Sequence, residues 1–149
     1  MNPERQHDRR TFLQLAIGAA ACSACADAAP ASGPRAFGDV SAGTVSALQV
    51  GSIVAIRGIS ACIARDARGL YAMTLTCTHA GCDMSSRGTI SKSGIVCNCH
   101  GSEFDDNGAV VAGPASAPLQ HFEVTVDAGG AITVHGGSPV EAAVRVPVA

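Results

Sequence analysis

The hydrophobic positions of the chain form short apolar runs rather than long helical stripes. These runs are rich in Val and Ile, which favour strands. Turn-forming residues lie between several of them, at 66–69, 106–108 and 127–130. We therefore predict an all-β body of antiparallel strands, with the strands at 45–50, 53–56, 61–64, 70–75, 89–90, 95–96, 109–111, 121–126 and 131–134.

Residues 1–29 follow a different pattern. Arg9 and Arg10 precede Phe12 and Leu13, and an uncharged, alanine-rich run continues to residue 26. The pattern resembles a twin-arginine export signal, which implies export to the periplasm. The apolar run is shorter than the roughly 18 to 20 residues of a membrane-spanning helix, which favours a cleaved leader. A retained membrane anchor, a lipid attached at Cys22 and an ordinary buried helix are the alternatives.

The rest of the chain divides into a linker and one domain. Residues 30–38 are rich in Ala, Pro, Ser and Gly and are predicted to be a flexible linker. Residues 39–149 are predicted to be one domain, because a chain of 149 residues with 47% hydrophobic residues is long enough for one core. The net charge of −2 gives no reason to expect a nucleic-acid partner.

Four cysteines and two histidines are concentrated in two short segments, CTHAGC at 77–82 and CNCHGSEF at 97–104. Thiolate and imidazole groups are strong metal ligands, so this spacing predicts a metal centre. A structural zinc site and ordinary disulfides beside surface histidines are alternatives. The zinc site would use Cys77, His79, Cys97 and His100.

Together the two segments resemble the cluster-binding signature of Rieske iron-sulfur proteins, of the disulfide-containing kind found in cytochrome bc-type complexes. The resemblance continues to GPASAPL at 113–119, which resembles the proline loop that covers the cluster in that family. It extends over roughly residues 45 to 135. The resemblance implies a Rieske-like antiparallel β-sandwich, with a small cluster-binding subdomain at about 75–120.

The resemblance also implies one 2Fe-2S cluster and assigns its ligands. Cys77 and Cys97 would bind one iron as thiolates, and His79 and His100 would bind the other as neutral imidazoles. A disulfide would join the two remaining cysteines of the loops. The residues carried over from the family are therefore the ligands Cys77, His79, Cys97 and His100, the disulfide pair Cys82 and Cys99, and the surrounding residues Ser102, Phe104, Gly113 and Pro114.

Mixed ligation determines the expected redox range. Two imidazoles in place of two thiolates raise the reduction potential to about −150 to +300 mV, against about −400 mV for plant-type clusters. Ser102 matches the position whose hydroxyl reaches a bridging sulfide in the family. Phe104 replaces the tyrosine of high-potential members and lacks its hydroxyl, so we expect an intermediate potential.

The implied function is one-electron transfer in the periplasm. The expected partner is a redox protein such as a cytochrome or a periplasmic oxidoreductase, and we expect catalysis only within a larger assembly. A Rieske subunit of a quinol-oxidising cytochrome bc-type membrane complex is one alternative, although Ala80 stands where such subunits usually have leucine. The ferredoxin of a ring-hydroxylating oxygenase is another.

Other reactive residues have simpler interpretations. Cys62 lies in an apolar run and is predicted to be a small buried hydrophobe. His121 and His135 are interpreted as ordinary strand or surface histidines. The acidic run at 103–106 is predicted to be a solvated loop that leads into a turn. Asp105 matches the family pattern, and a charge beside the cluster would be able to bias the choice of partner.

Overall fold

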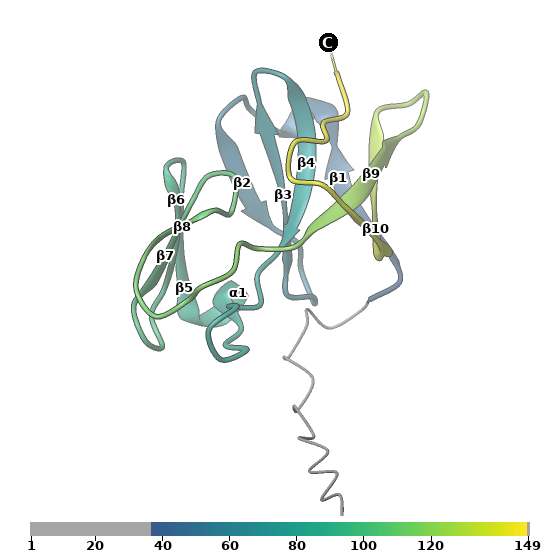
Figure 1. The fold of residues 1–149 in the computed structure, drawn as a ribbon. Coiled ribbons are helices and arrows are strands. Elements are labelled where there is room, and N and C mark those ends of the chain that lie inside the picture. Colours follow the sequence, from purple (N-terminus) through teal and green to yellow (C-terminus); the bar gives the residue numbers. More distant parts are fainter. Residues whose placement is uncertain (1–36, 149) are drawn as a thin grey trace, which may run out of the picture.

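The computed structural model describes residues 37–148, which form antiparallel sheets with a single short α-helix (Figure 1). The all-β prediction is confirmed. The predicted export signal and almost all of the predicted linker lie outside the described residues. Within residues 37–148, no helix has the length and apolar character needed to span a membrane.

The strands form two sheets (Figure 1). The large sheet has the order β1 (Asp39–Thr44), β10 (Ala131–Val140), β9 (His121–Val126), β4 (Gly69–Thr74), β3 (Ala61–Asp66) and β2 (Ser52–Ala55). The small sheet follows a one-turn helix, α1 (Met84–Arg87), and has the order β5 (Gly88–Ser91), β6 (Gly94–Cys97), β7 (Ser102–Asp105) and β8 (Val110–Ala112).

Strands β3 and β4 are buried on both faces. Successive side chains of a strand point to opposite faces. Ile63 and Leu70 therefore pack with Phe122 in one core, whereas Cys62 and Met73 pack in a second core with residues of the small sheet. This double burial explains why the two strands appear in the sequence as continuous apolar runs.

Two edge regions differ from the prediction. Residues 45–50 were predicted to be a strand, but Val45–Ala47 is a short 3-10 helix in which the Leu48 N–H donates to the Val45 carbonyl oxygen. The chain crosses here from β1 to β2, which lie at opposite edges of the large sheet. β1 itself was not predicted, because its sequence DVSAGT is small and polar. Its pairing with β10 maintains the strand.

The acidic run at 103–106 was also predicted wrongly in part. Its first residues belong to β7, which pairs with both β6 and β8. Ser102 and Phe104 are buried and Glu103 is exposed, which is the alternation of a half-buried strand. The turn after the strand was predicted correctly.

Candidate functional site

The two cysteine- and histidine-bearing loops lie together at one end of the small sheet. The first loop follows β4 and is closed by hydrogen bonds from the Cys77 N–H to the Cys82 carbonyl oxygen (2.9 Å) and from the Gly81 N–H to the Cys77 carbonyl oxygen (2.8 Å). The second loop joins β6 to β7, and the Gly101 N–H donates to the Cys97 carbonyl oxygen (2.9 Å). Each loop is thus a tight turn that holds its cysteine and histidine close together.

A disulfide between Cys82 and Cys99 links the two loops, with their Cα atoms 6.6 Å apart. This pairing confirms the one that the family resemblance implied. The Sγ atoms of Cys82, Cys97 and Cys99 all lie within 4.8 Å of one another, so the disulfide is adjacent to the Cys97 thiol. A covalent link at this position restricts independent movement of the loops.

Cys77 and Cys97 are buried at the base of the loops, with 2% and 1% of their surface exposed. Both side chains belong to the same core cluster. Burial raises the pKa of the Cys97 thiol, and the adjacent Cys77 raises it further, although backbone hydrogen bonds from Cys99 and His100 lower it. A metal ion that displaces the thiol protons would neutralise the unfavourable charge of two adjacent buried thiolates.

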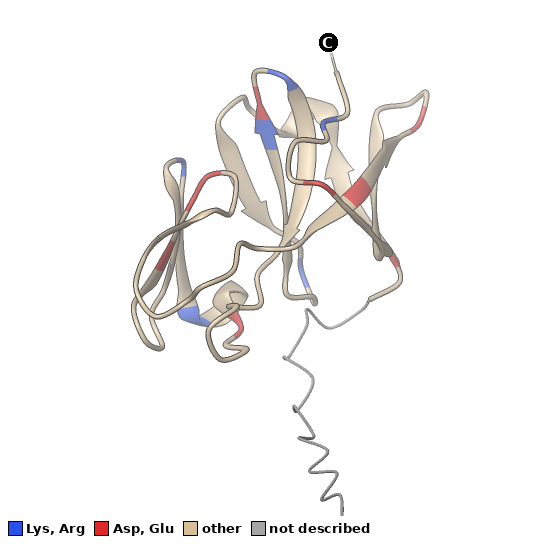
Figure 2. Ribbon diagram, viewed as in Figure 1, with Lys and Arg blue, Asp and Glu red and all other residues tan. Residues whose placement is uncertain are grey.

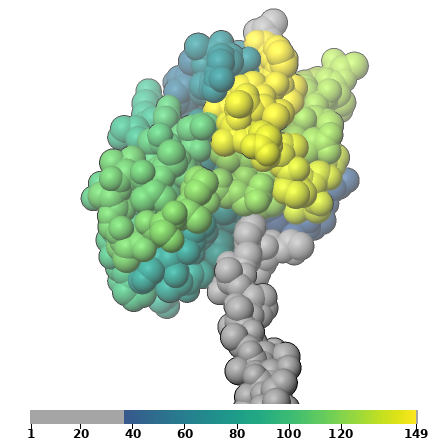
Figure 3. All heavy atoms as spheres, viewed as in Figure 1, coloured from purple at the N-terminus to yellow at the C-terminus, as the bar shows by residue number. Residues whose placement is uncertain are grey.

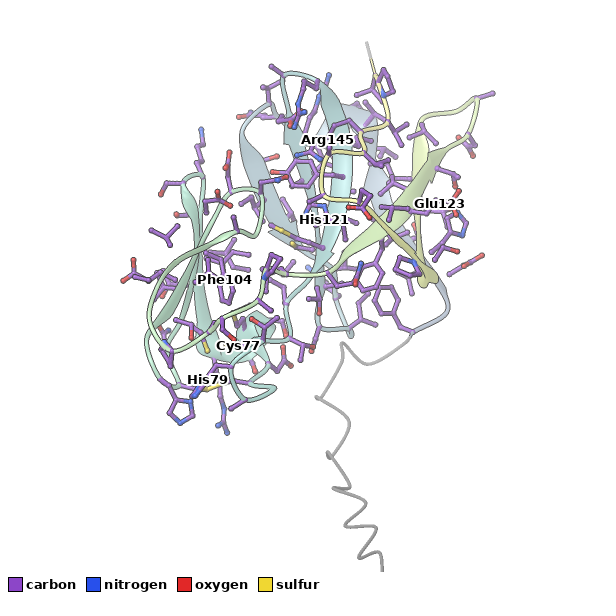
Figure 4. The ribbon with its side chains drawn as sticks, viewed as in Figure 1. Cys77, His79, Phe104, His121, Glu123 and Arg145 are labelled. Atoms are coloured by element: carbon purple, nitrogen blue, oxygen red, sulfur yellow. A yellow bond between two sulfur atoms is a disulfide. The ribbon has the colours of Figure 1, made fainter. Side chains whose placement is uncertain are left out.

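His79 and His100 lie at the exposed ends of the same loops. Their rings meet edge to face, with centroids 4.9 Å apart. Figure 4 shows His79 at the outer edge of the molecule and Cys77 further inside. The loops therefore present a buried sulfur pair and an exposed nitrogen pair.

These two pairs fit a two-metal centre better than a single zinc ion. One tetrahedral ion needs its ligand atoms in one compact group. Among the described residues, the group of ligand atoms that converges within 4.8 Å is that of Cys82, Cys97 and Cys99, and two of these form the disulfide. The chemistry of the donor set, two thiols in one pair and two imidazoles in the other, fits a 2Fe-2S cluster with one pair on each iron.

The loop at 113–119 packs against both cysteine loops. The Thr78 hydroxyl donates to the Ala117 carbonyl oxygen (2.6 Å), and the Ala115 N–H donates to the Ser102 hydroxyl oxygen (3.2 Å). Gly113 has a φ of 91°, and a Cβ there would collide with the Gly101 carbonyl oxygen and the Ser102 Cα. Only glycine allows this close approach.

Ser102 and Phe104 lie under the site on β7, with 0% and 3% of their surface exposed. Phe104 belongs to the same core as Cys77 and Cys97. Asp105, in contrast, ends β7 at the far end from the loop that carries His100. Its carboxylate accepts hydrogen bonds from the N–H groups of Asn107 (3.0 Å) and Ala109 (2.8 Å). The expectation of a partner-selecting charge beside the cluster is therefore wrong, because Asp105 shapes a turn.

The remaining cysteine and histidines of the domain lie away from the loops. Cys62 is fully buried, and burial raises its pKa to about 12, which confirms its interpretation as a buried hydrophobe. His135 contacts Asp39 through Nδ1 (2.9 Å) and Thr125 through Nε2 (2.9 Å). His121 is a strand residue as expected, but it is 2% exposed and contacts Tyr71.

The chain is similar in sequence to known iron-sulfur subunits and in structure to two solved protein chains. The cytochrome b6-f complex iron-sulfur subunit of Cyanothece sp. is 43% identical over 61 residues, covering 40% of this chain and 33% of the relative. The chain thus aligns with about a third of such curated relatives' length. A chain in the complex of reduced oxygenase and oxidized ferredoxin of carbazole 1,9a-dioxygenase is 30% identical with a TM-score of 0.51, covering 69% of this chain and 97% of that one. The plasma membrane Rieske protein of Synechocystis PCC 6803 is 29% identical with a TM-score of 0.50, covering 64% and 97%.

The family match includes both loops and all of the proposed cluster surroundings. The family model described as Rieske [2Fe-2S] domain matches residues 39–123, which is more than half of the chain. The chain therefore belongs to the Rieske [2Fe-2S] family, whose cofactor is a 2Fe-2S cluster and whose members carry electrons.

Proposed function

We propose that this chain is a periplasmic one-electron carrier that holds its cluster through Cys77, Cys97, His79 and His100. The observation that carries this proposal is the separation of the four side chains into a buried thiol pair and an exposed imidazole pair. When bound, the cluster supplies a centre that accepts and releases one electron. The thiols anchor it inside the domain, and the imidazoles face the partner.

The surface around the imidazoles indicates how a partner docks. Ala80, Gly81 and Gly101 are exposed beside the two histidines. Figure 2 shows that charged residues are scattered over the domain rather than gathered at this tip. Docking would depend on shape and short-range contact, so the partner, a cytochrome or a periplasmic oxidoreductase, would present a weakly charged surface around its own redox centre.

Metal analysis and spectroscopy test the cofactor assignment. Protein purified anaerobically should contain iron and acid-labile sulfide, and after reduction it should give the low-field-shifted electron paramagnetic resonance signal of a mixed nitrogen and sulfur cluster. Bound zinc without iron would reject the proposal. A stopped-flow titration against a small periplasmic cytochrome should then show second-order oxidation with a weak dependence on ionic strength.

Export is the second part of the proposal. The disulfide between Cys82 and Cys99 supports it, because disulfides persist in oxidising compartments such as the periplasm. Replacing both Arg9 and Arg10 by lysine should leave the protein in the cytoplasm, whereas the unchanged chain should appear in the periplasmic fraction. Equal distribution of the two chains would reject the twin-arginine route. Carbonate extraction would separate a cleaved leader from a retained anchor.

A subunit of a quinol-oxidising complex is the second candidate. The cytochrome b6-f iron-sulfur subunits among the relatives favour it. Ala80 argues against it, because a small exposed side chain gives less apolar contact with a partner than leucine would. Co-purification with a membrane cytochrome complex that oxidises quinol would favour this candidate over the free carrier.

A further inference from the structure

Three side chains from separate segments of the large-sheet region contact one turn of the small sheet. The turn is formed by residues 105–108, between β7 and β8. The Tyr71 hydroxyl of β4 donates to the Asp106 carbonyl oxygen (2.8 Å). His121 Nε2 of β9 lies 2.9 Å from the Asn107 carbonyl oxygen, and the Arg145 guanidinium donates to the Asn107 side-chain oxygen.

The Tyr71 ring also contacts the other two side chains. The Arg145 guanidinium carbon lies 3.7 Å from the centroid of the Tyr71 ring, and the Tyr71 ring stacks with His121 at a centroid distance of 5.8 Å and an angle of 14°. Planar groups that stack in this way restrict one another's rotation. We call Tyr71, His121 and Arg145 the turn clamp.

Arg145 belongs to the C-terminal segment, which covers part of the large sheet (Figure 3, yellow). Its side chain is 6% exposed, its Nε donates to Asp66 (2.7 Å), and its Nη1 donates to the carbonyl oxygens of Ala142 and Val144 (2.8 Å each). Burial alone would raise the pKa of Asp66. Several contacts oppose this effect, the hydrogen bond from Arg145 most strongly, and the pKa of Asp66 lies below its ordinary value. The ion pair is therefore maintained at neutral pH.

The clamped turn is connected to both sides of the cluster site. β7 begins at Ser102, so the turn and the Ser102 hydroxyl lie at opposite ends of one four-residue strand. The Leu119 N–H, at the end of the proline loop, donates to the Gly108 carbonyl oxygen (2.9 Å). A Cβ on Gly108 would collide with the Leu119 side chain, so this junction is tightly packed. Displacement of the turn would thus move Ser102 and the proline loop together.

We infer that Tyr71, His121 and Arg145 are positioning residues, which hold the 105–108 turn and thereby set the placement of Ser102 and the proline loop over the cluster. The inference rests on the proposed function, because it requires a cluster between the two cysteine loops. In Figure 4 the labelled His121 and Arg145 lie toward the large sheet, while His79 lies at the outer tip of the small one. The turn clamp would thus act on the cluster through the hairpin of β7 and β8, not by direct contact with the cluster.

Substitution of Tyr71 by phenylalanine tests the inference with the least disturbance, because it removes the hydroxyl and keeps the ring beneath Arg145. The midpoint potential of the holo-protein should fall, since a displaced Ser102 hydroxyl stabilises the added electron less well. Amide exchange at Gly108 and Ala115 in the purified protein should rise about fivefold, the effect of losing one hydrogen bond. His121→Gln is a second variant, and His135→Gln is the matched control that changes neither measurement.

A double-mutant cycle with Ser102→Ala separates positioning from general loss of stability. If the clamp acts through Ser102, Tyr71→Phe should change the potential less when residue 102 is alanine than when it is serine. Equal shifts in the two backgrounds, or an unchanged potential, would overturn the inference. Faster exchange spread evenly over the chain would also overturn it. If the protein bound no cluster, the proposed function would fail, while local exchange at the turn would still report whether the clamp holds it.

Discussion

The rings of His79 and His100 meet edge to face at the exposed tip of the domain, although they belong to different loops. We predict that each histidine binds the outer iron. Replacing either one by alanine should abolish the low-field-shifted resonance signal of the reduced protein, because mixed ligation would be lost. His135→Ala, which alters a histidine elsewhere in the large sheet, should preserve the signal. An unchanged spectrum in His79→Ala or His100→Ala would refute the ligand assignment.

Phe104→Tyr should raise the midpoint potential. Phe104 is buried in the core that contains Cys77 and Cys97, and a tyrosine there would add a hydroxyl able to donate to a ligand sulfur. Redox titration followed by visible absorption measures the change. Phe37→Tyr is a suitable control because Phe37 packs against Phe122 in the other core. A midpoint that stays the same or falls would contradict the prediction.

Loss of the disulfide should lower the stability of the domain and leave the four proposed cluster ligands in place. Cys82 and Cys99 are separated by 17 positions in the sequence, and closing a loop of that size contributes about 3 kcal/mol to the free energy of unfolding. The double variant Cys82→Ser and Cys99→Ser should therefore unfold at lower urea concentration and release iron faster. Cys62→Ser, a buried cysteine outside the loops, distinguishes loss of the crosslink from loss of any thiol. Equal stability of the crosslinked and serine proteins would contradict the prediction.

Gly113→Ala should displace the proline loop. Gly113 and Gly43 have nearly the same φ, 91° and 89°, but of the two only Gly113 has backbone atoms that a Cβ would meet. Gly43→Ala should therefore cost only the backbone strain of about 1–2 kcal/mol. Gly113→Ala should cost more and should also increase oxygen-driven bleaching of the cluster. Equal losses of stability in urea denaturation would show that the close approach to Gly101 is unimportant.

Local sequence patterns predict the central strands because both faces of those strands are buried. The apolar run at 70–75 is buried throughout β4, so composition alone identifies it. β1 has no such signal, since its small and polar residues are held in the sheet by pairing with β10. β7 was missed because Glu103 and Asp105 flank Phe104, although the alternation of burial is the ordinary pattern of a strand.

The turn clamp shows why part of the site region could not be predicted. The cysteines and histidines of each loop are close together in the sequence, so they form a motif that the sequence alone reveals. The disulfide that the family resemblance implied is present in the structure. Tyr71, His121 and Arg145 are distant in sequence and have no shared motif. Tertiary packing alone brings them together on the 105–108 turn, so single residues such as His121 appeared ordinary.

His121 should make the stability of the domain fall in mildly acidic solution. Its Nε2 is bonded to the Asn107 carbonyl oxygen, and its Nδ1 is buried without a partner. Burial lowers the pKa of His121 below its ordinary value of 6.5, and Arg145 lowers it further, against opposing effects of Asn107 and Asp105.

The unfolded chain therefore takes up a proton at His121 more readily than the folded one, so stability is highest above pH 6.5 and declines as the pH falls below it. Urea denaturation between pH 7.5 and 5.5 measures the decline. His121→Gln should flatten it, because glutamine can still donate to the Asn107 carbonyl oxygen but does not titrate. His135→Gln should keep the decline, since His135 contacts Asp39 and Thr125 and its substitution leaves the contacts of His121 in place. Parallel curves for His121→Gln and the unchanged protein would assign the acid sensitivity to other groups.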